Sequence, residues 1–258
     1  MGGVIALVYG LACYLIFFLT FSYAIGFVGN ILVPKGIDAP AQASLTSASL
    51  AEALVINTLL LGAFAVQHSL MARPGFKRLW TMIVPKSVER STYVLFASLV
   101  LILLFWQWRP MPTPVWVVEH PVGVLLLNTT FWLGFGLVLL STFLIDHFEL
   151  FGLRQVVSRM LGRDLPGPVF HLPWLYRQVR HPLYLGFVIA FWSAPVMSQG
   201  HLLFTVACTG YILLGIFFEE RDLIDTFGDT YRNYRRQVGM LIPRLGGGHV
   251  DTSKDPAE

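Results

Sequence analysis

Long apolar stretches separated by short polar segments dominate this chain. The first covers residues 4–33 and contains no charged side chain. The others cover residues 51–71, 92–108, 122–145, 183–197 and 201–218. A helix needs about 20 apolar residues to cross the hydrocarbon layer of a membrane, and the shortest stretches barely reach that length. The pattern predicts an all-α integral membrane protein of about six hydrophobic helices, five to six of them spanning.

The last two apolar stretches are separated only by Ser198-Gln199-Gly200, which is long enough for a turn and little else. We therefore expect a tight antiparallel helical hairpin over 183–218. The chain then divides into three N-terminal helices over 1–121, a core over 122–244 and a flexible, glycine-rich tail over 245–258. The core holds the fourth helix, a cytoplasmic connector, the hairpin and the C-terminal cytoplasmic helices.

Composition and charge agree with a membrane protein. The chain is 55% hydrophobic and only 13% charged, which is more apolar surface than a soluble domain can cover. With the N-terminus in the cytoplasm, 16 of the 18 Lys and Arg residues lie in cytoplasmic segments, as the positive-inside rule requires. We expect a multi-pass protein of the inner (cytoplasmic) membrane with both termini inside, and no cleaved signal peptide. Homo-oligomerisation is left open.

The net charge of +3 does not indicate a nucleic-acid partner. The basic residues are spread over every cytoplasmic loop instead of forming one patch, and the tail mixes them with Asp and Glu. Cys13 and Cys208 stand alone in apolar helices, without a second ligand at metal spacing, so we expect no metal site. Membrane lipids are the expected surroundings of the helices.

Two polar groups flank the predicted hairpin. Before it stands Arg180-His181-Pro182-x-Tyr184-x-Gly186, in which Pro182 suits a first helical turn and Gly186 leaves room for a ligand or a neighbouring helix. After it stands Glu219-Glu220, followed by Phe227-Gly228-x-x-Tyr231-x-x-Tyr234. Because a hairpin returns the chain to the same membrane face, we expect the two groups to emerge side by side.

These motifs resemble the isoprenylcysteine carboxyl methyltransferase and phospholipid methyltransferase superfamily over about residues 168–244. The resemblance implies that S-adenosylmethionine binds between the hairpin and the cytoplasmic helical segments that cover it. A carboxylate can bind ribose hydroxyls or the ammonium, a helix N-terminus can hold the carboxylate, and aromatic rings can face the sulfonium. The candidate cofactor residues are His171, Tyr176, His181, Pro182, Leu183, Tyr184, Gly186, Glu219, Glu220, Tyr231 and Arg235. Tyr231 and Arg235 could equally clamp the tail to the membrane face.

The upstream half is similar to the methanethiol S-methyltransferases. The stretches that carry this similarity are 67–74, 89–93, 146–155 and 191–195. The resemblance implies transfer of the methyl group of S-adenosylmethionine to methanethiol, a small thiol, to give dimethyl sulfide. The substrate arginine of the prenylcysteine enzymes is replaced by Gly215, which argues against a prenylcysteine carboxylate as acceptor.

The acceptor thiol has to lose a proton before it attacks the methyl group. His147 or Asp146, at the cytoplasmic end of the fourth helix, could accept that proton, and Arg154 or Arg180 could stabilise the thiolate. Asp146 and His147 could instead form a helix-end pair satisfied by Arg or by backbone. For His68, near the inner end of the second helix, we favour a bracing role over a chemical one.

Two other functions stay open at this point. A phospholipid or other lipophilic acceptor would need an opening toward the lipid that admits an acyl chain. The N-terminal half, residues 1–121, also resembles NnrU-type membrane proteins. That similarity allows a non-enzymatic role in handling haem or a small solute, with His68, His147 or His181 as ligands.

Overall fold

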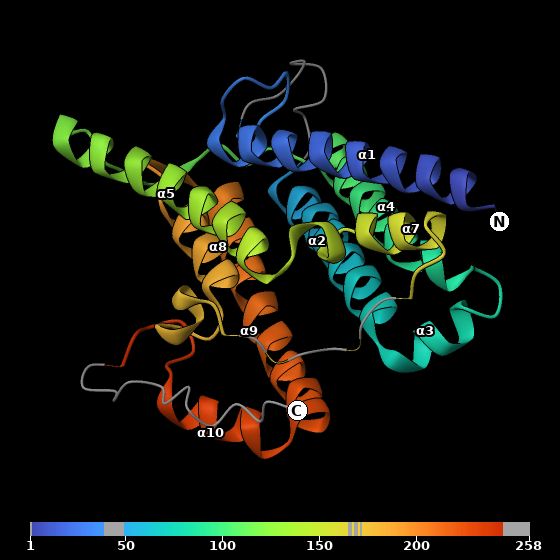
Figure 1. Ribbon diagram of the computed structural model, residues 1–258. Helices are drawn as coiled ribbons and strands as arrows, with labels where there is room; N and C mark the ends of the chain where they lie inside the picture. The colour runs from blue at the N-terminus through green and yellow to red at the C-terminus, as the bar shows by residue number, and fades with distance from the viewer. Residues whose placement is uncertain (1, 39–48, 165–166, 168–169, 171, 245–258) are drawn as a thin grey trace.

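The computed structural model describes residues 2–38, 49–164, 167, 170 and 172–244 (Figure 1). Within these residues, five helices are long and apolar enough to cross a membrane. They are α1 (Gly3–Gly29), α2 (Leu50–Ala72), α4 (Lys86–Gln107), α5 (Pro121–Ile145) and α9 (Gln199–Phe227). A sixth apolar helix, α8 (Pro182–Trp192), has only 11 residues. The predicted all-α membrane fold is confirmed.

The remaining elements are short and connect or flank the long helices. They are α3 (Pro74–Trp80), β1 (Pro114–Val117), α6 (His147–Leu150), α7 (Leu153–Met160), the 3-10 helix η2 (Trp174–Arg177), β2 (Val196–Ser198) and α10 (Asp229–Gln237). In Figure 1, α10 lies beyond the lower end of α9, and α3 lies at the lower end of α2. The predicted flexible tail, 245–258, and the candidate His171 lie outside the described residues.

Helix α8 corrects the predicted hairpin. It ends at Trp192 instead of continuing to residue 197, and the chain then forms β2, which pairs antiparallel with β1. The predicted three-residue turn is therefore wrong, because α9 begins directly after β2 with Ser198 as its N-cap. At about 1.5 Å per residue, α8 spans only ~16 Å. The extended segment β2 then connects α8 to α9.

Backbone groups freed at the end of α8 are satisfied by side chains of α9. The Phe191 carbonyl accepts hydrogen bonds from Thr205 Oγ1 (3.0 Å) and His201 Nε2 (3.1 Å). Trp116 Nε1 donates to the Ala194 carbonyl at 3.2 Å. Non-helical backbone at membrane depth is tolerated only where protein satisfies it, and these contacts do so.

Two glycines set the close packing of α8 against α5. A Cβ atom added at Gly186 would lie 2.7 Å from the Gly134 carbonyl oxygen, and one added at Gly134 would lie 2.7 Å from the Gly186 carbonyl oxygen. Small residues let helix backbones approach closely in a membrane. Of the two roles open to Gly186, the structure therefore shows the contact with a neighbouring helix.

An aromatic core lies between α1, α4, α5, α8 and α9. Its buried members include Phe27, Phe105, Trp108, Phe131, Phe135, Phe191 and Phe204. Beyond this core, the segments that follow α1, α4 and α8 meet at one end of the molecule. There Trp108 Nε1 donates to the Ile37 carbonyl at 3.1 Å, and Ser198 hydrogen-bonds Asp38. The predicted outside residues, Lys35 and Arg109, belong to these segments.

Candidate active site

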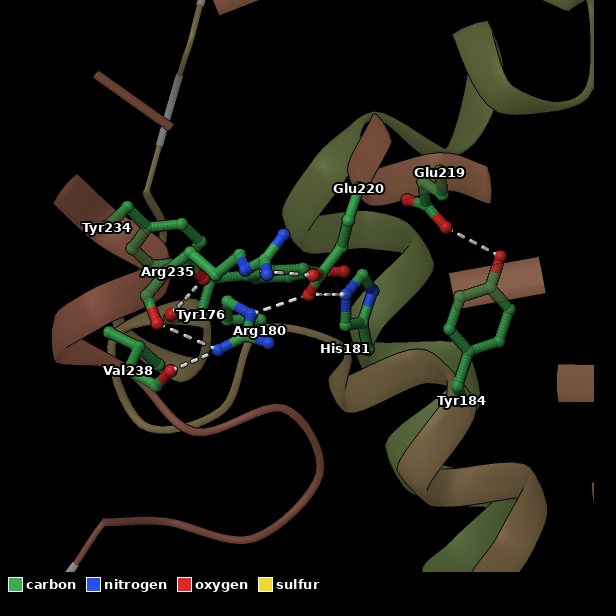
Figure 2. A network of polar contacts seen from close by, with 9 residues as sticks. All are labelled: Tyr176, Arg180, His181, Tyr184, Glu219, Glu220, Tyr234, Arg235 and Val238. Atoms are coloured by element: carbon green, nitrogen blue, oxygen red, sulfur yellow. Dashed lines mark hydrogen bonds and ion pairs between the residues drawn. The ribbon is translucent and has the colours of Figure 1, made fainter. Parts of the chain in front are cut away.

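The segment before α8 is fixed by the segment after α10. Val179 forms a β-bridge with Gly239, the Arg180 amide donates to the Gly239 carbonyl at 2.8 Å, and the His181 amide donates to the Met240 carbonyl at 3.2 Å. Pro182 then opens α8 as its first residue, as predicted, because its missing N–H would have no helical partner there. This arrangement brings the two polar groups together (Figure 2).

Arg180 and Glu220 form a buried ion pair at the centre of Figure 2. Arg180 Nε lies 2.7 Å from Glu220 Oε1, and the two side chains are only 8% and 9% exposed. The guanidinium also donates to the carbonyls of Arg235 (3.1 Å) and Val238. A buried charge of this kind requires full pairing, and these contacts supply it. Arg180 therefore joins α9 to the segment around α10.

The Glu220 carboxylate contacts two further side chains. His181 Nε2 lies 3.1 Å from Glu220 Oε1, and Arg235 Nε lies 3.5 Å from Glu220 Oε2. His181 is buried, whereas the Arg235 side chain is 51% exposed. Arg235 therefore has donor groups directed to the surroundings as well as to Glu220, and it can meet an anionic group of a ligand.

Tyr184 and Glu219 form the second contact between α8 and α9. The Tyr184 hydroxyl donates to Glu219 Oε2 at 2.8 Å, and the His181 and Tyr184 rings lie 5.6 Å apart. Both members of the hydrogen bond are half-buried. Among the described residues, Tyr184 is the one side chain that hydrogen-bonds Glu219, so the carboxylate keeps acceptor positions for other donors.

A tyrosine cluster lies beside the segment that precedes α8. Tyr231 and Tyr234 of α10 are buried, and the Tyr234 hydroxyl donates to the Tyr176 carbonyl. Burial raises the pKa of Tyr231 and of Tyr234 above the usual value of a phenol. Burial also raises the pKa of Tyr176, and the negative charge of Glu219 adds to that effect. All three phenols are therefore neutral hydrogen-bond donors at physiological pH.

Asp146 and Arg154 belong to a different network, at the end of α5. Asp146 caps α6 by accepting from the Glu149 amide at 2.9 Å, and its other oxygen pairs with Arg154. Arg154 also lies 2.8 Å from Glu149. Among the described residues, no hydrogen bond or ion pair joins this network to Arg180, Glu219 or Glu220. The geometry corresponds to the helix-end pair, one of the two interpretations left open by the sequence.

His147 is enclosed by aromatic rings and has both ring nitrogens engaged. Nδ1 lies 2.8 Å from Thr142 Oγ1, and Nε2 lies 2.8 Å from the Tyr14 hydroxyl. Thr142 already donates its proton to the Leu139 carbonyl, so Nδ1 carries the hydrogen and Nε2 accepts from Tyr14. Burial lowers the pKa of His147, and the Asp146 carboxylate opposes that shift only in part. The imidazole is therefore neutral, and its lone pair is occupied by Tyr14.

The structure thus gathers most of the predicted cofactor residues and separates the predicted catalytic ones. Leu183 lies in the first turn of α8, next to Pro182. Gly239 and Met240 could not be predicted as partners from the sequence, because their backbone groups make the contacts and their side chains do not. Tyr14 was not predicted either. In the part of the chain that the structure describes, no three His, Cys, Asp or Glu side chains form a group that could hold a metal ion.

Curated proteins similar to this chain point to one family. A methanethiol S-methyltransferase of Bradyrhizobium diazoefficiens is 58% identical over 239 residues, which cover 93% of this chain and 82% of that protein. A methanethiol S-methyltransferase of Mycobacterium tuberculosis is 54% identical over 93% of this chain and 96% of its own length. Nurim of Rattus norvegicus is more distant, at 30% identity over 70% of this chain and 72% of its own length.

No family model and no solved structure matches the chain. The curated similarity nevertheless extends over 93% of this chain and over 82% and 96% of the two methyltransferases. The resemblance expected from the sequence is therefore confirmed, and the chain belongs to the methanethiol S-methyltransferase family.

Proposed function

We propose that the protein transfers the methyl group of S-adenosylmethionine to methanethiol and so produces dimethyl sulfide. The observation that carries this proposal is the identity of 58% and 54% to two relatives named for that reaction. The geometry adds support, because Tyr184, Glu219 and Arg235 present an aromatic ring, a carboxylate and a cation around one site. S-adenosylmethionine has groups that match these three: a sulfonium for the ring, hydroxyls and an ammonium for the carboxylate, and a carboxylate for the cation.

The donor set at this site fits S-adenosylmethionine. Glu219, with unused acceptor positions, would accept from ribose hydroxyls or from the ammonium, and Arg235 would meet the carboxylate. The ring of Tyr184 would face the sulfonium, since aromatic faces attract cations. When bound, this cofactor supplies an electrophilic methyl group whose sulfur carries a positive charge. Arg180 and Glu220 hold the walls of the site in place by their own pairing.

The remaining catalytic task of the chain is to exclude water and orient the reactants. A thiolate and a sulfonium are both charged, and both charges disappear as the methyl group moves, so a dry site favours the reaction. Tyr184, in the first turn of α8, and Glu219, two turns before the end of α9, are both half-buried and so provide such surroundings. Because Arg180 is fully occupied by Glu220 and by backbone carbonyls, we assign it to positioning and not to thiolate binding.

We further propose that this site faces the cytoplasm from the inner membrane. The segments that carry Lys35 and Arg109 meet at the opposite end, whereas the basic segments 72–91, 146–164, 172–181 and 219–244 flank the site. The positive-inside rule then assigns the site to the cytoplasmic face, where the cofactor is made. The same orientation places both termini inside.

Headspace detection of dimethyl sulfide from cells that express this chain and receive methanethiol tests the proposal. We expect dimethyl sulfide from the wild type, its loss in Glu219→Ala, and its retention in the control Glu119→Ala, since Glu119 is exposed and far along the chain from the site. Absence of the product from the wild type contradicts the proposal. Purified protein should also bind S-adenosylhomocysteine by calorimetry. A strong visible absorption band would instead favour the haem-handling function.

A further inference from the structure

A second polar cluster lies deeper between the helices, and the proposed function has not used it. On α2, the Ser69 hydroxyl lies 3.0 Å from the Tyr211 hydroxyl of α9. Next to it, the His68 ring packs on Phe64 and lies 5.1 Å from the ring of Tyr93, which α4 contributes. Polar and ionisable groups at membrane depth are rare and indicate a functional site, so this cluster needs an explanation.

His68 is the imidazole side chain of this cluster. Its Nδ1 and Nε2 atoms lie 3.0 Å and 2.9 Å from the same Tyr93 hydroxyl oxygen. One hydroxyl cannot align with both nitrogens at once, so only one nitrogen is engaged at any time. Tyr93 is buried, and its hydroxyl therefore orients the ring while leaving a nitrogen for another partner.

The cluster adjoins the proposed cofactor site along one face of α9. Tyr211, Gly215 and Glu219 are four residues apart, so they share that face over about 12 Å. Helix α2 flanks it through Ser69, and α8 flanks it through Tyr184.

Gly215 leaves space in the middle of this face. A Cβ atom added there would meet no heavy atom within 4 Å. The space lies one helical turn from Glu219 on one side and one turn from Tyr211 on the other. It suits a small acceptor, since any larger side chain at position 215 would fill it.

We infer that the acceptor thiol binds beside Gly215, between Glu219 and Tyr211, and that His68, oriented by Tyr93, takes its proton. This inference rests on the proposed methyl transfer. The S–H proton passes to the imidazole lone pair of His68. The thiolate sulfur then forms a bond to the methyl carbon, and the bond from that carbon to the sulfonium sulfur breaks, with its electron pair remaining on that sulfur. Two neutral thioethers and an imidazolium result, and the imidazolium proton returns to water.

This assignment separates His68 from His147. Both nitrogens of His147 are occupied by Thr142 and Tyr14, whereas His68 shares one hydroxyl between two nitrogens. His68 also belongs to the cluster that reaches α9 near Glu219. The sequence favoured a bracing role for His68 itself. In this assignment Tyr93 and the stacked Phe64 ring hold His68 in place instead.

A change of acceptor distinguishes proton transfer from bracing. We would purify His68→Gln, whose amide can still bond Tyr93, and measure its rate with methanethiol and with methaneselenol. The selenol has nearly the same size but is already ionised at neutral pH. We expect the rate with methanethiol to fall about 100-fold or more, as for loss of a general base, and the rate with methaneselenol to stay within a few-fold of the wild type. The exposed residue His120 provides the control, and His120→Gln should match the wild type with both acceptors.

Equal losses with both acceptors would overturn the base role of His68, and so would unchanged rates with both. The binding space is tested separately with Gly215→Phe, which should abolish turnover while S-adenosylhomocysteine still binds. Gly210→Phe is its matched control. A Cβ atom added at Gly210 would also meet no heavy atom within 4 Å, but Gly210 lies about 140° around α9 from Gly215. Full activity of Gly215→Phe would overturn the placement of the thiol. If the wild type methylates neither acceptor, the proposed function itself fails.

Discussion

The hydroxyl of Tyr184 donates a 2.8 Å hydrogen bond to the carboxylate of Glu219. This bond joins the first turn of α8 to α9 across 35 residues of sequence. It leaves the Tyr184 ring half-buried and Glu219 with spare acceptor positions. The pair thus links two helices. It also keeps an aromatic ring and carboxylate acceptor positions available to a ligand.

Removal of the Tyr184 hydroxyl should weaken cofactor binding more than it weakens the fold. In Tyr184→Phe the ring remains, but Glu219 loses the donor that orients it. A hydrogen bond to a charged group contributes about 1.5–3 kcal/mol, so we expect S-adenosylhomocysteine to bind roughly tenfold or more weakly. Calorimetry measures this change. Tyr23→Phe is the control, since the Tyr23 hydroxyl bonds the Lys35 carbonyl at the other end of the molecule.

Loss of Glu220 should destabilise the protein strongly. In Glu220→Ala, the buried guanidinium of Arg180 loses the carboxylate that pairs with it, and His181 loses a hydrogen-bond partner. Breaking a buried ion pair by removing one partner costs about 3–5 kcal/mol. Thermal denaturation in detergent should show a clearly lower midpoint than for Asp229→Ala, which removes an exposed ion pair with Arg232. Equal midpoints would show that the buried pair does not hold the site together.

The close packing of α8 against α5 leads to a second prediction about stability. In Gly186→Ala the new Cβ would lie 2.7 Å from the Gly134 carbonyl oxygen, so α8 and α5 must move apart. Overpacking of this kind costs about 1–3 kcal/mol. The control is Gly136→Ala, also in α5. Its added methyl group meets no heavy atom within 4 Å and should be tolerated. Circular dichroism melts of the two variants provide the comparison.

His147 should make stability depend on pH in a defined direction. Burial lowers the pKa of its imidazole in the folded protein below the ordinary value of 6.5, so the unfolded chain binds the proton more readily. Its contribution to stability is therefore complete above pH 6.5 and declines as the pH falls toward the folded-state pKa. His147→Gln should lose this part of the decline between pH 7 and pH 5 in thermal melts. An unchanged pH dependence would show that another group is responsible.

Much of the fold could be predicted from the sequence because lipid imposes simple requirements on length and hydrophobicity. The end of α8 could not be placed by hydropathy, since Ser193, Ala194 and Val196 continue an apolar stretch. Pro195 carried a signal, because the residue before a proline avoids the helical conformation. The break also depends on His201 and Thr205, which donate hydrogen bonds to the freed Phe191 carbonyl only after α9 has packed.

The candidate site was predictable where side chains form a local motif. Pro182 at the start of α8, and the meeting of Tyr184 with Glu219, followed from helix chemistry and from the return of the chain to one face. The partners of Arg180 were not predictable, because the carbonyls of Arg235 and Val238 carry no residue-specific signal. His147 and Tyr14 lie 133 residues apart, and no periodicity in a single sequence reveals such a contact.

The pairing of Val179, Arg180 and His181 with Gly239 and Met240 has a consequence for biosynthesis. Helices α8 and α9 precede residue 240 in the chain, so they are synthesised before it. Until then, Arg180 lacks its carbonyl partners and Glu220 lacks Arg235. A chain that ends before residue 238 would therefore contain all five long helices but could not form the contacts that hold Arg180 in place.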